Sequence, residues 1–230
     1  PAGASSADSS VHFATSSTAS STENSLEKIA HNYTLVQDQA ALTVLLNRLK
    51  EAKVYAFDTE TSGLNTMDAA LVGMSFCVKA HEAFWVPIAS DDWTEEGLLD
   101  ALQDVFSDPS KEVVAHHFKF DYKMLARRGV RIQNRLFDTM VAHYLIQPEG
   151  SHMLDRLAEI ELNYTAIPIT DLIGKAGKDQ RTMADLDAAS ITDYACEDVD
   201  ITWQLRERFI PQMHGVVATE LFEAVEMPLV

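Results

Sequence analysis

The segment Lys53–Glu60 (KVYAFDTE) constrains the fold more than any other part of the chain. It is rich in β-branched and aromatic residues, and its first residues are apolar on both faces, which predicts a central strand. Two further strand-like runs, Leu71–Val78 and Glu82–Ile88, follow after short connections containing Gly, Asn, Asp or His. Such connections favour an antiparallel meander. We therefore expect a sheet with the first segment near its centre.

The other regular patterns are strands and helices in alternation. Thr94 and Asp138 are suitable helix N-caps because their side chains can accept hydrogen bonds from the first turn. The expected strands are Tyr33–Val36, Glu112–His117 and Arg131–Phe137, and the expected helices are Ala40–Glu51, Thr94–Phe106, Asp121–Arg128 and Asp138–Ile146. The chain after Gly150 is mainly helical, with a loop at Asn163–Arg181. This order predicts one α/β domain with a mixed sheet.

The first residues, Pro1–Thr22, differ in composition from the rest, because small and hydroxylated side chains dominate. Such a segment cannot bury enough apolar surface to offset the entropy of ordering it. We therefore expect residues 1–25 to be a flexible linker.

Charge and cysteine content narrow the classes of partner. The sequence has 18 Lys and Arg against 35 Asp and Glu, a net charge of −17, which argues against a broad electrostatic grip on nucleic acid. Its apolar runs are much shorter than the ~20 residues that a membrane-spanning helix needs, so we expect no membrane partner. Two cysteines, Cys77 and Cys196, are too few for a disulfide framework, which fits a reducing cytoplasm.

Two carboxylates end the predicted central strand. Asp58 and Glu60 are two residues apart, so both side chains point to one face of the sheet. Like charges at the end of a buried strand repel each other and lose hydration, and a divalent cation such as Mg²⁺ or Mn²⁺ would remove both penalties. Taken alone, the pair is more typical of a solvated strand end, because the pattern is common by chance.

Further carboxylates follow later in the chain. Asp121 stands at a strand-to-helix junction, where a plain helix N-cap would also explain it. Tyr194 and Asp198 are four residues apart and hence share a helix face, which taken alone is typical of a solvated surface. Glu197 and Asp200 lie on other faces of that helix, so we expect them to point to solvent.

In combination and in this order, the motifs resemble those of the DEDD superfamily of 3′→5′ exonucleases, in the branch that carries tyrosine in the third motif. The chain is most similar to the proofreading exonuclease domains of bacterial DNA polymerase I, from Tyr33 to Leu221. The matching stretches are FDTETSGL (Phe57–Leu64), HFKFDYKML (His117–Leu125), FDTM (Phe137–Met140), GKAGKDQ (Gly174–Gln180) and YACEDVDIT (Tyr194–Thr202).

The resemblance implies a ribonuclease H-like α/β fold, with a central mixed five-stranded sheet flanked by helices. It also implies a domain order: a linker at residues 1–25, the exonuclease domain at residues 26–222, and the truncated start of a polymerase domain at residues 223–230. The natural partner would then be a covalently linked polymerase domain. The isolated domain is expected to be a monomer from a bacterial cytoplasm, associated with the nucleoid.

The resemblance further implies two divalent metal ions, Mg²⁺ or Mn²⁺. Asp58, Glu60 and Asp198 would hold one ion, and Asp58 and Asp121 the second. Tyr194 would orient the attacking water together with Glu60. Two ions of this kind supply both the nucleophile and charge stabilisation in phosphodiester hydrolysis, so the expected product is a 5′-mononucleotide released from a 3′ end.

The substrate implied by the family is the 3′ end of single-stranded DNA. The residues that match substrate contacts of the family are Thr59, Leu64, His117, Lys119 and Phe120. Leu64 would wedge between terminal bases, although a core position after a turn would also explain it. Lys119 would neutralise a phosphate or the carboxylates, although a plain surface lysine is the alternative.

Two other functions fit part of the pattern. An RNA-trimming exonuclease of the same superfamily shares the three motifs and the tyrosine. A catalytically silent spacer that positions a polymerase domain is the alternative from outside the enzymes. The retention of all four carboxylates and the tyrosine argues against the spacer.

Overall fold

The computed structural model describes residues 24–213 and 218–230. Within these residues the main sheet has six strands in the order β2-β5-β4-β3-β6-β7. The strands are β2 (Asn32–Leu35), β3 (Val54–Thr61), β4 (Leu71–Lys79), β5 (Glu82–Pro87), β6 (Glu112–Ala115) and β7 (Arg135–Asp138). The expected α/β class is confirmed, but the count of five strands is wrong, because β2 adds to the edge of the sheet beside β5.

The directions of the strands are mixed, as expected. β3, β4 and β5 form the antiparallel meander, while β6 runs parallel to β3 and β7 runs parallel to β6. β2 runs parallel to β5. The segment Lys53–Glu60 is therefore central, as its apolar faces predict, because β3 has a hydrogen-bonded neighbour on each side.

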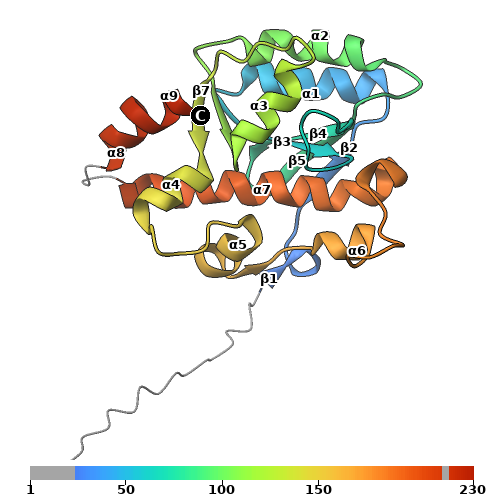
Figure 1. The fold of residues 1–230 in the computed structure, drawn as a ribbon. Coiled ribbons are helices and arrows are strands. Elements are labelled where there is room, and N and C mark those ends of the chain that lie inside the picture. The colour runs from blue at the N-terminus through green and yellow to red at the C-terminus, as the bar shows by residue number, and fades with distance from the viewer. Residues whose placement is uncertain (1–23, 214–217) are drawn as a thin grey trace, which may run out of the picture.

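Helices cover both faces of this sheet (Figure 1). They are α1 (Gln39–Glu51), α2 (Glu95–Phe106), α3 (Phe118–Ala126), α4 (Thr139–Ile146), α5 (Leu154–Leu162), α6 (Ile169–Ile173), α7 (Ala188–Met213), α8 (Ala218–Leu221) and α9 (Met227–Leu229). The N-caps at Thr94 and Asp138 are confirmed, since both side chains accept backbone N–H bonds. None of the helices in the described ranges has the length and apolar character needed to span a bilayer.

The alternation of side chains along β3 divides the core in two. Tyr55 and Phe57 are fully buried against α1, α2 and α3, and the ring of Phe57 lies 5.2 Å from that of Phe106. Ala56 faces the second core, which α4, α5 and α7 build on the other face. Asp58 and Glu60 continue this second series, so they project toward α7.

The ends of the described structure bear on the expected domain borders. Asn24–Ser25 form β1, which pairs in parallel with β8 (Tyr164–Thr165), so an ordered element begins inside the range expected to be linker. The loop expected at Asn163–Arg181 contains β8 and the short helix α6. Pro1–Thr22 lie outside the described residues. The expected start of a polymerase domain at residue 223 stays a prediction; Phe222–Glu226 form a π-helical turn, and Met227 packs against the second core.

Candidate active site

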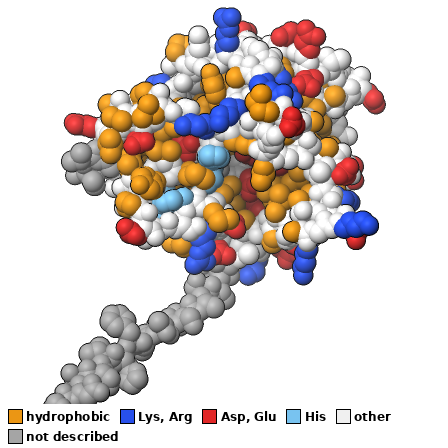
Figure 2. Space-filling model, viewed as in Figure 1, with side chains coloured by type: hydrophobic (Ala, Val, Ile, Leu, Met, Phe, Trp, Pro, Cys, Tyr) orange, Lys and Arg blue, Asp and Glu red, His pale blue; other side chains and the backbone are white. Residues whose placement is uncertain are grey.

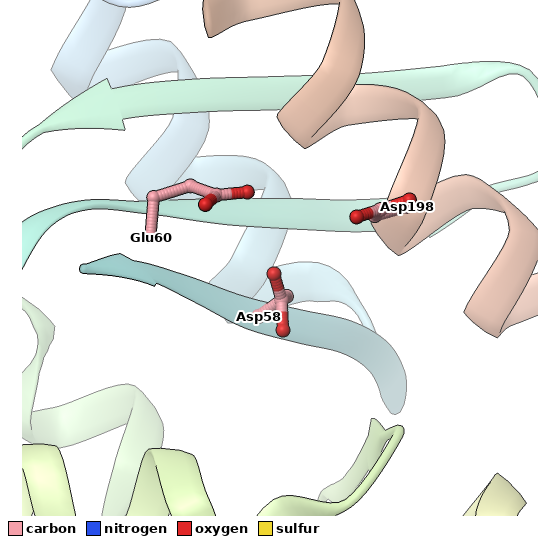
Figure 3. Close-up of side chains that lie close together, drawn as sticks. All are labelled: Asp58, Glu60 and Asp198. Carbon is pink, nitrogen blue, oxygen red and sulfur yellow. The ribbon is translucent and has the colours of Figure 1, made fainter. Parts of the chain in front are cut away.

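Three carboxyl groups from two elements meet at the end of β3. Asp58 and Glu60 are the fifth and seventh residues of that strand, and the pairing of β3 with β4 shifts register immediately after Glu60. Asp198 reaches them from α7. One carboxylate oxygen of each residue lies within 4.8 Å of the other two, and Figure 3 shows the three groups turned toward one another. In residues 24–213 and 218–230 these are the only three His, Cys, Asp or Glu side chains grouped this closely.

Asp121 lies beside this group but does not cap its helix. α3 begins at Phe118, three residues earlier than expected, so Asp121 lies inside the first turn and the N-cap interpretation is wrong. The Asp121 side chain is buried, and its Oδ1 accepts hydrogen bonds from both the amide N–H and the hydroxyl of Thr59. The start of α3 is held by Asp138, whose carboxylate accepts from the amides of His117 and Phe118 as well as from α4.

The four carboxylates perturb one another. Burial raises the pKa of Asp58 to about 7. Burial and then the charges of Asp58 and Asp198 raise the pKa of Glu60 well above its ordinary value. Burial and the charge of Asp58 also raise the pKa values of Asp121 and Asp198. Each shift records a carboxylate that loses hydration beside other negative charges.

No basic side chain relieves this repulsion. Among the described residues, none of the four carboxylates forms an ion pair with Lys, Arg or His. Asp58 and Asp198 are only partly buried, so a ligand can reach them. Oxygen donors alone, close together and without a counter-charge, suit a hard divalent cation. The residues present therefore fit the metal that the sequence implies.

Tyr194 contributes a phenolic hydroxyl group to this cluster. It lies one turn before Asp198 on α7, and its phenol interacts with that carboxylate. Burial and the charges of Asp198 and Glu60 raise the pKa of the phenol above its ordinary value. The hydroxyl therefore stays protonated at neutral pH and acts as a hydrogen-bond donor.

The residues expected to contact substrate are placed differently from one another. Leu64 is 91% exposed, so the core alternative for this residue is wrong. His117 and Lys119 are exposed, and Phe120 is partly buried against the first core. Thr59 is buried and uses its amide and hydroxyl to hold Asp121. Substrate contacts by these residues stay predictions.

Glu197 and Asp200 correct the sequence analysis, which expected them to face solvent. Both are buried on α7. Glu197 accepts hydrogen bonds from the Tyr164 hydroxyl and the Ile167 amide, each at 2.6 Å. Asp200 accepts from the Tyr33 hydroxyl at 2.8 Å and the His81 amide at 2.9 Å. Their partners lie up to 167 residues away in the chain, so no local pattern could have revealed them.

Comparison with known proteins shows the family of the chain. A family model described as 3′-5′ exonuclease matches residues 33–214. DNA polymerase I of Pseudomonas aeruginosa is 33% identical over 209 residues, which cover 86% of this chain and 23% of the relative. DNA polymerase I of Borreliella burgdorferi is 30% identical over 207 residues, which cover 89% of this chain and 22% of the relative. The chain thus spans less than a quarter of these relatives.

Solved structures of low sequence identity share the fold. RNase D of Trypanosoma brucei superposes with a TM-score of 0.69 at 16% identity, covering 84% of this chain and 70% of that one. NrnC of Brucella melitensis with bound Mg²⁺ gives a TM-score of 0.63 at 18% identity, covering 85% and 88%. Together with the family match and the grouped carboxylates, these findings identify the chain as a member of the 3′-5′ exonuclease family found in DNA polymerase I.

Proposed function

We propose that this chain is a metal-dependent 3′→5′ exodeoxyribonuclease that hydrolyses the 3′-terminal phosphodiester of single-stranded or frayed DNA and releases 5′-mononucleotides. The observation that carries the proposal is the meeting of Asp58, Glu60 and Asp198 within 4.8 Å, with Asp121 beside them and no basic partner among the described residues. Such a group of carboxylates is costly unless a cation binds it.

Two divalent ions, Mg²⁺ or Mn²⁺, fit this donor set. Asp58, Glu60 and Asp198 would hold one, and Asp58 with Asp121 the other. When bound, such ions supply an activated water and charge stabilisation at the attacking and leaving oxygens. Thr59 keeps the Asp121 carboxylate aimed at the cluster through its two hydrogen bonds.

The chain's own residues would orient the reactants. Tyr194 stays protonated, so its hydroxyl can hold a water in line with the scissile phosphate but cannot remove the proton of that water. Glu60 would accept a hydrogen bond from the same water. Leu64, exposed at 91%, would wedge between terminal bases, which favours unpaired ends because those bases separate at little cost.

The natural context of the chain is proposed to be a DNA polymerase I, in which excision would serve proofreading. This rests on the relatives, which are DNA polymerases I of about four times the matched length. The carboxylates would then act on a primer end delivered by a linked polymerase domain.

A 5′-labelled single-stranded DNA tests the proposal. With Mg²⁺ or Mn²⁺ we expect shortening from the 3′ end in single-nucleotide steps, and EDTA should stop it because the carboxylates alone supply no nucleophile. Absence of shortening at any concentration of either ion would favour the silent spacer. A matched RNA strand that is shortened faster than the DNA would favour the RNA-trimming alternative.

A further inference from the structure

Three cations form a row along the solvent face of α3. Lys119 and Lys123 lie in the helix and Arg127 is its C-cap residue, and all three are exposed. Residues four apart lie on the same side of a helix, so successive cations of the row are separated by about 6 Å along its axis. We call these three residues the α3 cation row.

Among the described residues, the row forms no ion pair with an acidic side chain. Five arginines elsewhere form ion pairs with glutamates: Arg48, Arg128, Arg156, Arg206 and Arg208. Within the described part of the chain the row forms no such pair, and the guanidinium of Arg127 donates to the carbonyl of Thr66. The single acid of α3 is Asp121, which is buried and points away from this face. In a chain with 35 acids and 18 bases, a row of cations without an ion pair is unusual.

The row begins at the carboxylate cluster. Lys119 shares the first turn of α3 with Asp121, and Lys123 and Arg127 follow at one-turn intervals away from the cluster. Figure 2 shows Lys and Arg side chains on the surface formed by α3, above a hollow that contains acidic side chains. Tyr122, 42% exposed and three residues after Lys119, adds an aromatic ring beside the first cation of the row.

We propose that the α3 cation row binds successive phosphates of the DNA strand that leads into the site, on the 5′ side of the scissile bond. The inference rests on the proposed function and extends it by naming the surface along which the DNA strand runs. The spacing of the row is comparable to that of neighbouring phosphates on an extended strand, and aligned cations beside an aromatic ring are typical of single-strand binding surfaces. The domain is acidic, so its net charge repels DNA. The row supplies local positive charge that can bind the phosphates of the strand.

A matched pair of double variants tests this path. Lys119→Gln/Lys123→Gln removes two cations of the row. Lys53→Gln/Lys79→Gln removes two exposed lysines at the far end of the sheet, where Ala56 pairs with Cys77, so the net charge changes equally. The measurement is kcat/KM for a long oligothymidylate in Mg²⁺ over a range of KCl concentrations, with a thymidine dinucleotide as the short substrate.

Each phosphate contact on a single strand contributes about 0.7 to the salt slope, so loss of two contacts should lower the slope by about 1.4. Over a tenfold rise in salt, the wild type should therefore lose about 25-fold more kcat/KM than the row variant. The advantage of the long substrate over the dinucleotide should shrink in the row variant and persist in the control variant. Equal salt slopes in the two variants would refute phosphate binding by the α3 cation row and would leave the proposed function intact. A wild type that shortens no strand would overturn the proposed function itself.

Discussion

Helix α7 carries carboxylates on two sides, and their surroundings differ. Asp198 faces Asp58 and Glu60, whose charges oppose its own. Glu197, the preceding residue, instead accepts two hydrogen bonds at 2.6 Å from the Tyr164 hydroxyl and the Ile167 amide. Asp200 is likewise surrounded by donors. Adjacent residues of one helix therefore enter two opposite electrostatic environments.

The difference shows that burial of a carboxylate does not by itself indicate a metal site. Glu197 and Asp200 are satisfied by neutral donors from distant segments, so their burial fixes α7 against β8 and β2. The cluster at Asp58 has too few donors for its charge and needs a cation. One set positions the helix and the other, on our proposal, performs the chemistry.

The largest expected effect separates the two sets by activity. Asp58→Asn should lower kcat/KM by about 10³-fold or more, because this carboxylate is proposed to ligate both ions and metal stabilisation of the transition state amounts to several kcal/mol. Asp200→Asn is the matched control, since it removes the same charge from a residue outside the cluster. Near-normal turnover by Asp58→Asn on single-stranded DNA would refute the metal assignment.

The next effect separates the two sets by stability. Glu197→Ala leaves the Tyr164 hydroxyl and the Ile167 amide without an acceptor, which should lower the free energy of unfolding by about 2–4 kcal/mol. Urea denaturation in EDTA and in Mn²⁺ measures this loss. The increment that Mn²⁺ adds should match that of the wild type. If Mn²⁺ no longer stabilises a Glu197→Ala variant that still folds, Glu197 belongs to the metal site. The distinction between Glu197 and the cluster at Asp58 would then be wrong.

The fold follows from the sequence wherever a local pattern determines it. The apolar faces of Lys53–Glu60 placed β3 at the centre, and the side chain of Asp138 placed the start of α4. β2 was recognised as a strand, yet its pairing with β5 rests on contacts between segments about 50 residues apart. The five-stranded sheet implied by the resemblance left out this strand, and its place in the sheet was not predictable because pairing, unlike propensity, is not a local property.

The grouping of the four carboxylates was predictable for a different reason. Asp58, Glu60, Asp121 and Asp198 could be listed only because three ordered motifs matched a family; taken singly, each had a plain structural explanation. Glu197 stood inside the same motif, and helix geometry alone suggested that it faced solvent. Glu197 accepts hydrogen bonds from Tyr164 and Ile167. These two residues belong to a segment with no strong periodicity, so its position beside α7 could not be predicted.

Measured per pH unit, the smallest expected effect is a dependence of metal-free stability on pH. In EDTA the folded pKa of Asp58 is about 7, above its ordinary value of 3.8. A carboxyl whose folded pKa is raised adds stability at low pH and loses it as pH rises from about 4 to 7, by at most about 1.4 kcal/mol per pH unit. His116 has the opposite slope, since burial lowers its pKa from 6.5 to about 3 and its stability contribution falls as pH falls. The difference in unfolding free energy between wild type and Asp58→Asn cancels the His116 contribution.

That difference, measured in EDTA from pH 4 to 8, should move in favour of Asp58→Asn as pH rises, because only the wild type must then carry the charge. In Mn²⁺ the trend should reverse, because ligation requires the deprotonated carboxylate and metal binding strengthens over the same range. Glu197→Gln is the control, since a residue outside the cluster should not change sign with Mn²⁺. A wild type whose pH dependence is the same in EDTA and in Mn²⁺ would show that Mn²⁺ does not bind at Asp58 and would contradict the metal assignment.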